Sequence, residues 1–160
     1  MIRIGFAKDI HQLVEGDCLL LGGIKIPSKN RIIAHSDGDV VLHAVSESLL
    51  GSLSLGDLGT YFPPEDDKYK NYSSIEIVKF CYDLVKKQDY RINNLDISIE
   101  LEKTKLKPYI LDMRKSISKI LDININQVSI KAMTNEKMDA TGSGKAIVAY
   151  CVCLVGDKYE

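Results

Sequence analysis

Residues 146–155 read AIVAYCVCLV, a nearly continuous apolar run of strand-forming and small residues. A run of this kind is typical of a strand that is buried on both faces of a sheet. At an exposed edge it would offer unpaired backbone groups and apolar side chains to other chains. We therefore expect this strand to lie in the centre of its sheet, or to pack against copies of itself in an oligomer.

The segments on either side of this strand follow helix and strand periodicities in a mixed order. The helix at 39–54 has Asp39 as a plausible N-cap, and Ser73 and Glu76 have the spacing of a capping box. The order predicts one domain of the α+β class over residues 1–160, with helices packed on one face of a mixed β-sheet. The predicted strands are 2–8, 18–26 (after a turn at 16–17 and with a bend or bulge at 22–23), 95–101 and 128–134. The predicted helices are 39–54, 73–88 and 108–121, and the predicted loops are 61–71 and 135–145.

The composition excludes several classes of protein. The chain has 160 residues, 45% of them hydrophobic, and its 21 basic and 22 acidic residues leave a net charge of −1. This balance gives no basic face for nucleic acid or an anionic membrane, and no apolar run is long enough to span a bilayer. The chain opens on the strand-like segment 2–6 without a leader, which predicts a bacterial cytoplasmic protein, or a plastid-type one whose transit peptide has been removed.

The four cysteines include no C-x-x-C pair. Cys151 and Cys153 are two apart on a predicted strand, so they face the same side and are poorly placed to bridge each other. We expect reduced, buried thiols.

All three histidines lie among aspartates within the first 43 residues, in the segments DIH (9–11) and HSDGDVVLH (35–43). Imidazole and carboxylate are ligands that zinc accepts, and a catalytic zinc site needs only three of them. The period of a strand places Asp9 and His11 on one face, and His43 lies one turn into the predicted helix. A lone histidine is more often a hydrogen-bonded structural residue, but the three together favour a metal site at Asp9, His11 and His43.

The other acids of this region, and the remaining polar candidates, are open to more than one interpretation. Asp37 and Asp39 could orient an imidazole, cap the helix, or do both. His35 could contact a substrate phosphate or be a solvent-exposed loop residue. Glu136 could hold Mg²⁺, although from spacing alone a solvated loop glutamate is the better interpretation.

Several motifs together point to a known family. They are RIGxxxDxH (3–11), AHSDGDxxxHA (34–44), LGDLG (55–59), KAxTxEK (131–137) and TGxG (141–144), with the positions Lys105, Pro108, Met113 and Arg114. The chain resembles the 2-C-methyl-D-erythritol 2,4-cyclodiphosphate synthases of the non-mevalonate isoprenoid pathway over essentially its whole length. The second of these motifs is highly specific, and the others support it.

The resemblance implies a homotrimer with active sites between neighbouring subunits. It implies Zn²⁺ at Asp9, His11 and His43, where Mn²⁺ or Co²⁺ could also bind, and Mg²⁺ at Glu136. It implies catalytic roles for His35 and Thr134. The implied substrate contacts are His35 and Ser36 near the phosphates, Asp57 and Gly59 at the methylerythritol, and Lys105, Met133 and Thr134 on the cytidine diphosphate side.

The implied activity is a phosphorus–oxygen lyase reaction. The 2-phosphate of 4-diphosphocytidyl-2-C-methyl-D-erythritol 2-phosphate attacks its own β-phosphorus, which closes a cyclic diphosphate and releases CMP. Two other hypotheses stay open: a zinc-dependent phosphohydrolase, and a non-catalytic trimer that binds nucleotides or isoprenoid diphosphates. The chain departs from the common family pattern at Ala7, Lys8, Glu47, Met133 and Ser143, and none of these is a predicted metal ligand.

Overall fold

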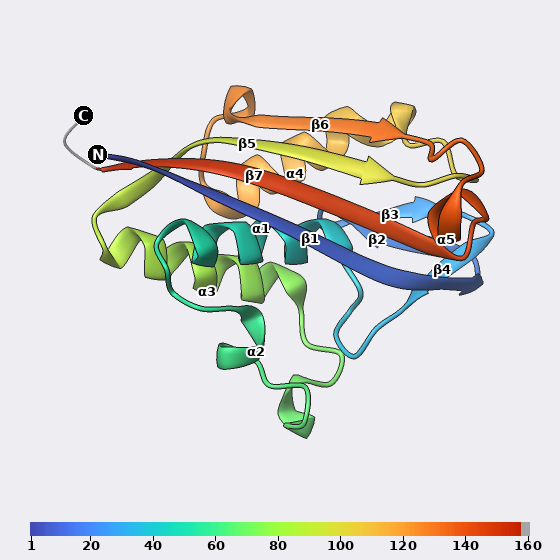
Figure 1. The fold of residues 1–160 in the computed structure, drawn as a ribbon, viewed down its shortest axis with the longest axis horizontal. Helices are drawn as coiled ribbons and strands as arrows, with labels where there is room; N and C mark the ends of the chain where they lie inside the picture. The colour runs from blue at the N-terminus through green and yellow to red at the C-terminus, as the bar shows by residue number, and fades with distance from the viewer. Residues whose placement is uncertain (158–160) are drawn as a thin grey trace.

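The apolar C-terminal run forms the central strand of the sheet in the computed structural model, which describes residues 1–157 (Figure 1). The last three residues of the predicted domain, 158–160, lie outside the described part. The sheet has the strand order β4-β1-β7-β5-β6, so the prediction of a central strand is confirmed. Its strands are β1 (Ile2–Glu15), β4 (Asn30–Ile33), β5 (Tyr90–Glu100), β6 (Val128–Met133) and β7 (Ala146–Asp157).

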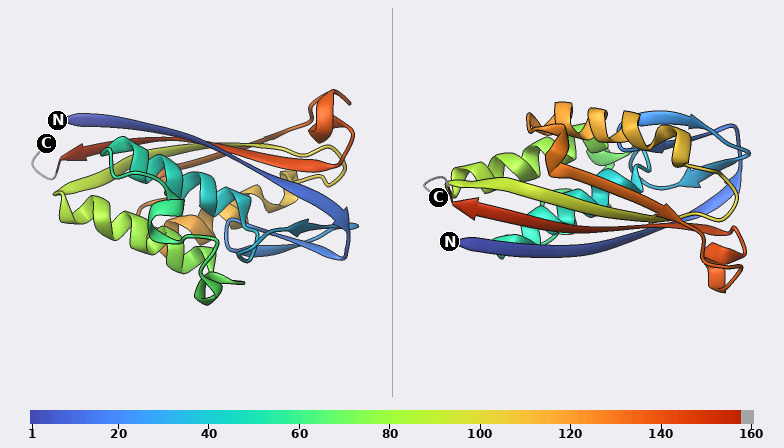
Figure 2. Two further views of the ribbon diagram at one scale, coloured as in Figure 1. Left: turned by 60° about the horizontal axis from the view of Figure 1, so that its bottom comes forward. Right: turned by 90° about the horizontal axis from the view of Figure 1, so that it is seen from above.

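The sheet is mixed, and its helices cover one face. β5 and β6 are parallel, whereas β7 is antiparallel to both β1 and β5. The helices α1 (Val40–Ser52), α3 (Ser74–Lys87) and α4 (Ile110–Leu121) lie together on one side of the five strands (Figure 2). The predicted α+β class with helices on one face is therefore confirmed. No helix of residues 1–157 has both the length and the apolar content needed to cross a membrane.

The N-terminal strands differ from their predicted bounds. β1 runs to Glu15 rather than to residue 8, because its polar residues past position 8 interrupt the apolar pattern without ending the strand. The predicted strand 18–26 is a hairpin of β2 (Cys18–Leu21) and β3 (Ile24–Pro27). Gly22 and Gly23 have φ values of +61° and +80°, which glycine adopts readily, so they form a turn rather than a bend. β4 was not predicted at all.

Other elements begin or end away from the predicted positions. α4 starts at Ile110, after a 3-10 turn at Lys107–Tyr109 that contains Pro108. β5 begins at Tyr90 rather than at residue 95. Two four-residue helices, α2 (Leu58–Tyr61) and α5 (Asp139–Gly142), occupy segments for which no helix was predicted.

The two predicted helix caps have different outcomes. Asp39 is the N-cap of α1, and its carboxylate accepts a hydrogen bond from the backbone N–H of Leu42 at 3.0 Å. The predicted capping box of α3 is wrong, because the Ser73 side chain makes no capping bond. The carboxylate of Asp37 instead accepts the N–H of Ser74 at 2.8 Å, which a local sequence pattern does not reveal.

The face of the sheet that carries the helices is closely packed against α1. A Cβ at Gly5 on β1 would lie 1.8 Å from the carbonyl oxygen of Ser48 on α1, so only glycine allows this approach. Cys151 and Cys153 of β7 are buried and free on the same side, as predicted, whereas the expected burial is wrong for Cys18, which is half-buried. The contact between Gly5 and Ser48 fixes the separation of β1 and α1, the two elements that carry the metal-ligand candidates.

We predict that the stability of the fold depends on pH through Asp39. Burial raises the pKa of this carboxyl from 3.8 to about 6, against the effect of the Leu42, Gly23 and Gly22 N–H donors. The native state therefore holds this proton at pH values where the unfolded chain has lost it. On account of this group, the free energy of unfolding should fall by about 2 kcal/mol as the pH rises from 4 to 7.

The measurement is chemical denaturation at fixed protein concentration across this pH range. The free energy of unfolding of the native protein should fall relative to that of Asp39→Asn as the pH rises through 6. Asp17→Asn, an exposed aspartate of another turn, serves as the control and should follow the native profile. Parallel profiles for all three proteins would contradict the prediction.

Candidate metal centre and substrate cavities

Three predicted ligands converge between β1 and α1. Asp9 and His11 lie two residues apart on β1, and His43 lies in the first turn of α1. One ligand atom from each of them lies within 4.8 Å of the other two, and all three side chains are partly buried. The structure thus brings Asp9, His11 and His43 together, as the sequence predicted.

The geometry of this cluster fits a bound cation. Asp9 Oδ2 lies 3.1 Å from His43 Nδ1 and 3.2 Å from His11 Nδ1. His11 Nδ1 is nevertheless buried without a properly directed hydrogen bond among the described residues. A buried polar atom without a partner costs about 1–3 kcal/mol, and a metal ion between these three donors would remove that cost.

The electrostatics of the cluster keep its carboxylate charged. Burial raises the pKa of Asp9, but the neighbouring imidazoles of His11 and His43 outweigh burial and bring this pKa to about 2. Burial lowers the pKa of His43, yet the carboxylate of Asp9 raises it above its ordinary value on balance. Asp9 is therefore an anion at neutral pH, as a metal ligand must be, and a metal ion at His43 would compete with a proton for the imidazole.

The two neighbouring aspartates have separate roles. Asp39 is fully buried, and besides capping α1 it accepts the N–H groups of Gly22 at 2.9 Å and Gly23 at 2.7 Å. Asp37 reaches the imidazole of His43 only through Ser74, whose Oγ lies 2.9 Å from His43 Nε2 and in short contact with Asp37. The sequence did not indicate Ser74, because it is 31 residues from His43 in the chain.

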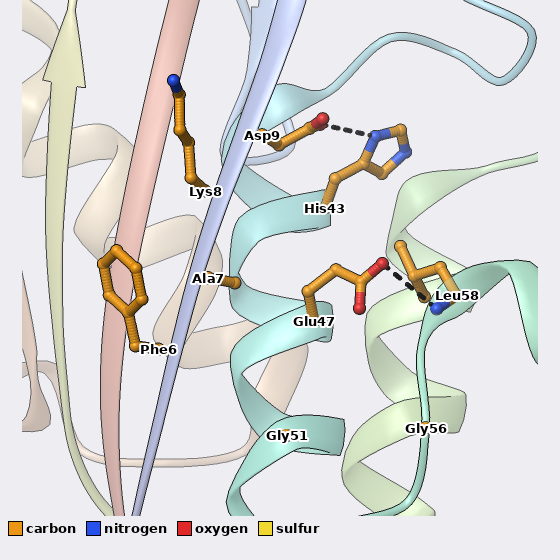
Figure 3. Close-up of a pocket in the computed structure, with 9 residues that line it drawn as sticks. All are labelled: Phe6, Ala7, Lys8, Asp9, His43, Glu47, Gly51, Gly56 and Leu58. Carbon is orange, nitrogen blue, oxygen red and sulfur yellow. Dashed lines mark hydrogen bonds and ion pairs between the residues drawn. The ribbon is translucent and has the colours of Figure 1, made fainter.

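A cavity of about 340 Å³ opens beside Asp9 and His43 (Figure 3). In that view the side chain of Lys8 leaves β1 on the opposite side from that of Asp9, whereas Glu47, one helical turn after His43, points into the cavity. Glu47 Oε1 accepts the N–H of Leu58 at 3.1 Å. Burial and the nearby carboxylates of Asp57 and Asp9 raise the pKa of Glu47, although the Leu58 N–H acts against them.

The bond from Glu47 holds the segment that contains Asp57 and Gly59. Both residues are exposed, and Asp57 caps α2 by accepting the N–H of Thr60 at 2.9 Å. Sequence reasoning treated Glu47 only as a departure from the family pattern. The structure gives it a function in attaching this segment to α1.

A second cavity, of about 160 Å³, shares the lining residues His43 and Leu58 with the first. Its lining includes His11, His35, Ser36 and His43 together with the rings of Phe62, Tyr69 and Tyr72. His35 and Ser36 therefore lie beside the metal-ligand candidates. Phe62 and Tyr69 belong to the predicted loop 61–71, and Tyr72 follows it directly. The only signal for this aromatic wall in the sequence is the number of Tyr and Phe residues in that segment.

The remaining predicted site residues lie elsewhere in the chain. Lys105, Met133 and Thr134 line a third cavity of about 260 Å³, formed by residues 101–107 and 132–134. This cavity shares no lining residue with the other two. Glu136 is exposed nearby and accepts the hydroxyl of Thr134 at 2.7 Å, so one chain does not bring Glu136 to the metal-ligand cluster.

Comparison with known proteins gives a consistent picture. Residues 2–156 match the model of the YgbB family. The chain is 44% identical to the 2-C-methyl-D-erythritol 2,4-cyclodiphosphate synthase of Clostridium perfringens, over 96% of this chain and 99% of the relative. It is 43% identical to the synthase of Fusobacterium nucleatum over 99% of both chains, and 47% identical to that of Acinetobacter baylyi over 96% of this chain and 94% of the relative.

Solved structures agree with this similarity. The bifunctional IspDF from Campylobacter jejuni superposes with a TM-score of 0.94 at 32% identity, over 100% of this chain and 44% of that larger chain. The CDP complex of IspF from Plasmodium falciparum superposes with a TM-score of 0.87 at 34% identity, over 98% of this chain and 97% of that one.

We predict that removing the Glu47 carboxylate loosens the segment that follows Gly56. In Glu47→Ala the amide of Leu58 loses its acceptor, so its hydrogen exchange should accelerate about ten-fold or more, as expected for a hydrogen bond to a charged group. Glu47→Gln keeps a carbonyl acceptor and should show most of the native protection. Amide exchange followed by NMR measures both.

The control is Asp83→Ala, which removes an acidic residue from the surface of α3. It should leave the exchange of Leu58 unchanged. Equal protection of this amide in Glu47→Ala and in the native protein would show that Glu47 does not hold the segment.

Proposed function

The chain belongs to the YgbB family, and from that premise we propose that residues 1–160 form one cyclodiphosphate-synthase-like domain. The protein is a phosphorus–oxygen lyase of isoprenoid biosynthesis. It cyclises 4-diphosphocytidyl-2-C-methyl-D-erythritol 2-phosphate to 2-C-methyl-D-erythritol 2,4-cyclodiphosphate and releases CMP. The observation that carries this function is the convergence of Asp9, His11 and His43 within 4.8 Å, in a chain similar to named synthases over nearly its full length.

The reaction needs positioning more than it needs a protein nucleophile. An oxygen of the 2-phosphate forms a bond to the β-phosphorus, and the bond from that phosphorus to the CMP oxygen breaks. The two reacting groups are both anions, so the protein must hold them in line and reduce their repulsion. His35 and Ser36 are assigned to the phosphates beside the metal centre, and His35 and Thr134 stabilise the charge that develops during transfer.

The metals are part of the proposal. Asp9, His11 and His43 would hold Zn²⁺, and Mn²⁺ or Co²⁺ could use the same donors. Glu136 would hold Mg²⁺, which commonly takes one or two carboxylates together with substrate phosphates. Bound there, the two ions would supply Lewis-acid polarisation and charge neutralisation at the phosphates.

The backbone conformation at Glu136 supports a functional role for this residue. Glu136 and Lys137 have φ values of +50° and +63°, a conformation that costs energy in residues other than glycine. Such strain is typical of functional sites.

The remaining assignments concern substrate recognition. Asp57 and Gly59 would bind the methylerythritol, in the segment that Glu47 attaches to α1. Lys105, Met133 and Thr134 would bind the cytidine diphosphate in the third cavity. A cytidine-diphosphate ligand is supported by the CDP complex of the Plasmodium falciparum relative.

We also propose that the protein is a homotrimer whose sites lie between neighbouring subunits. Two observations support this assembly. The metal ligands and the nucleotide-side residues line separate cavities in one chain, so a neighbour is needed to bring them together. The face of the sheet without helices exposes Ile4, Phe6 and Ile10 of β1 and Val152 of β7, by 41–67%, and exposed apolar patches often mark interfaces.

The compartment remains a proposal as well. The three synthases compared above are bacterial. Their origin supports the bacterial cytoplasm over a plastid-type organelle.

The function is tested by ³¹P NMR of the protein with the substrate and Mg²⁺, with and without EDTA. We expect a cyclic diphosphate and CMP to appear in equal amounts, only without the chelator or after Zn²⁺ and Mg²⁺ are restored. Inorganic phosphate instead would identify a zinc phosphohydrolase. Unchanged substrate, from a metal-loaded trimer, would identify a non-catalytic binding protein.

The matched variant in this assay is His43→Ala. Loss of a hydrogen-bond partner of a metal ligand typically weakens metal binding about 10- to 100-fold. Removing the ligand itself should weaken zinc binding by more than this, and turnover should be lost with it. Circular dichroism should show the native fold, because the variant leaves the Asp39 cap intact. Full activity in a zinc-free His43→Ala protein would contradict the assignment.

We further predict that Glu136→Gln changes the response to Mg²⁺ rather than the zinc content. The Mg²⁺ concentration for half-maximal turnover should rise about ten-fold or more, since the variant removes the one charged ligand assigned to that ion. Zinc measured by atomic absorption should stay at the native level. A superimposable Mg²⁺ titration would reject this role of Glu136.

A further inference from the structure

We propose that Asp37 and Ser74 form a relay that orients the imidazole of His43, with Ser74 as a positioning residue. In this relay His43 Nε2–H donates to Ser74 Oγ, and the Ser74 hydroxyl donates to the carboxylate of Asp37. Nδ1 of His43 is then left as the lone pair that faces Asp9. The inference rests on the proposed metal centre and deepens it.

The contacts of the relay are continuous. Ser74 Oγ lies 2.9 Å from His43 Nε2 and in short contact with Asp37 Oδ1. The other oxygen of Asp37 accepts the backbone N–H of Ser74 at 2.8 Å. Ser74 is fully buried, so water does not compete for its hydroxyl.

The direction of the hydrogen bonds follows from the chemistry of the groups. An ionised carboxylate only accepts hydrogen bonds, so the short contact requires the Ser74 hydroxyl to donate its proton to Asp37. The Ser74 oxygen then has only lone pairs to offer to His43, and Nε2 must carry a hydrogen. In the neutral imidazole the other nitrogen, Nδ1, is therefore unprotonated, and it lies 3.1 Å from Asp9 Oδ2.

Between His43 Nδ1 and Asp9 this arrangement can hold either a proton or a metal ion. A lone pair on Nδ1 and a carboxylate oxygen repel each other unless a proton or a cation lies between them. Histidines that bind metals commonly donate their second N–H to an outer acceptor, which fixes the tautomer and the ring. Here that acceptor is Ser74, and Asp37 makes it a stronger one.

Ser36 contacts the same nitrogen but is not equivalent to Ser74. Its Oγ lies 3.1 Å from His43 Nε2 and also accepts the N–H of Gly38 at 3.2 Å. In the described part of the chain no carboxylate accepts the Ser36 hydroxyl, and Ser36 lines the second cavity. Its hydroxyl is thus free to turn toward a ligand, which makes Ser36 the matched comparison.

The relay also joins α1 and α3. Asp37 accepts the N–H of Asp39, the cap of α1, at 3.2 Å. It also caps α3 through Ser74, and its own N–H donates to the carbonyl of Tyr72 at 3.2 Å. The ring of His43 is therefore held relative to both helices.

The test compares Ser74→Ala, Ser74→Thr and Ser36→Ala with the native full-length chain. Zinc affinity is measured by competition with a chromophoric chelator, and the fold of each variant is checked by circular dichroism. We expect Ser74→Ala to weaken zinc binding about 10- to 100-fold. Ser74→Thr, which keeps the hydroxyl, should recover most of this loss, and Ser36→Ala should change zinc affinity less than three-fold.

A second measurement needs no folded variant. In the zinc-loaded native protein labelled with ¹⁵N-histidine, only three residues give imidazole signals. We expect His43 to show a slowly exchanging Nε2–H and a metal-bound Nδ1. A protonated Nδ1, or an Nε2–H that exchanges as fast as that of a free histidine, would overturn the proposal even if Ser74→Ala does not fold.

The outcomes separate this proposal from the proposed function. If the native protein neither binds zinc nor turns over the substrate, the function itself fails. If the native protein does both, but folded Ser74→Ala binds zinc with native affinity, only the relay is rejected.

Discussion

The structure depends first on the buried carboxylate of Asp39. A fully buried carboxyl group is costly unless it is hydrogen-bonded, and three backbone N–H groups surround this one. One belongs to the start of α1 and two belong to the β2–β3 turn. These donors cannot be supplied unless the helix begins at Val40 and the hairpin lies against it. His43 is then always one turn into α1, so the position of a candidate metal ligand follows from the need to supply hydrogen-bond donors to a nearby buried carboxylate.

The second constraint is the close approach of β1 to α1. Gly5 lets the strand lie against the backbone of Ser48, and a side chain there would push the strand away. Asp9 is four residues further along the same strand, so the separation at Gly5 determines whether Asp9 reaches His43. The candidate metal centre is therefore built from two elements whose spacing is set by Gly5, a residue that carries no functional side chain.

The sequence predicted what local patterns and short spacings encode. The central strand β7, the helix after Asp39, and the cluster of Asp9, His11 and His43 were all expected from nearby residues. Two of the features that the sequence did not reveal depend on contacts between residues distant in the chain. Nothing near Ser73 reveals that Asp37 caps α3, and nothing near Glu47 reveals its bond to Leu58. β1 was predicted too short because Asp9 and His11 are polar, and half-buried site residues break the alternation that identifies a strand.

The apolar run at residues 146–155 allowed two interpretations, a central strand or a surface packed against other copies, and they are compatible. On one face of β7, Cys151 and Cys153 are buried against α1. On the other face Val152 lies beside Phe6 of β1, and both are exposed in the isolated chain. In the proposed trimer this second face would also be buried, so one strand would serve both the core of the subunit and the interface. Because the metal ligands and the nucleotide-side residues occupy different cavities of one chain, the same association that covers this face would also complete the active site. Assembly and catalysis would then share one source of free energy, the burial of a sheet face that a monomer leaves open.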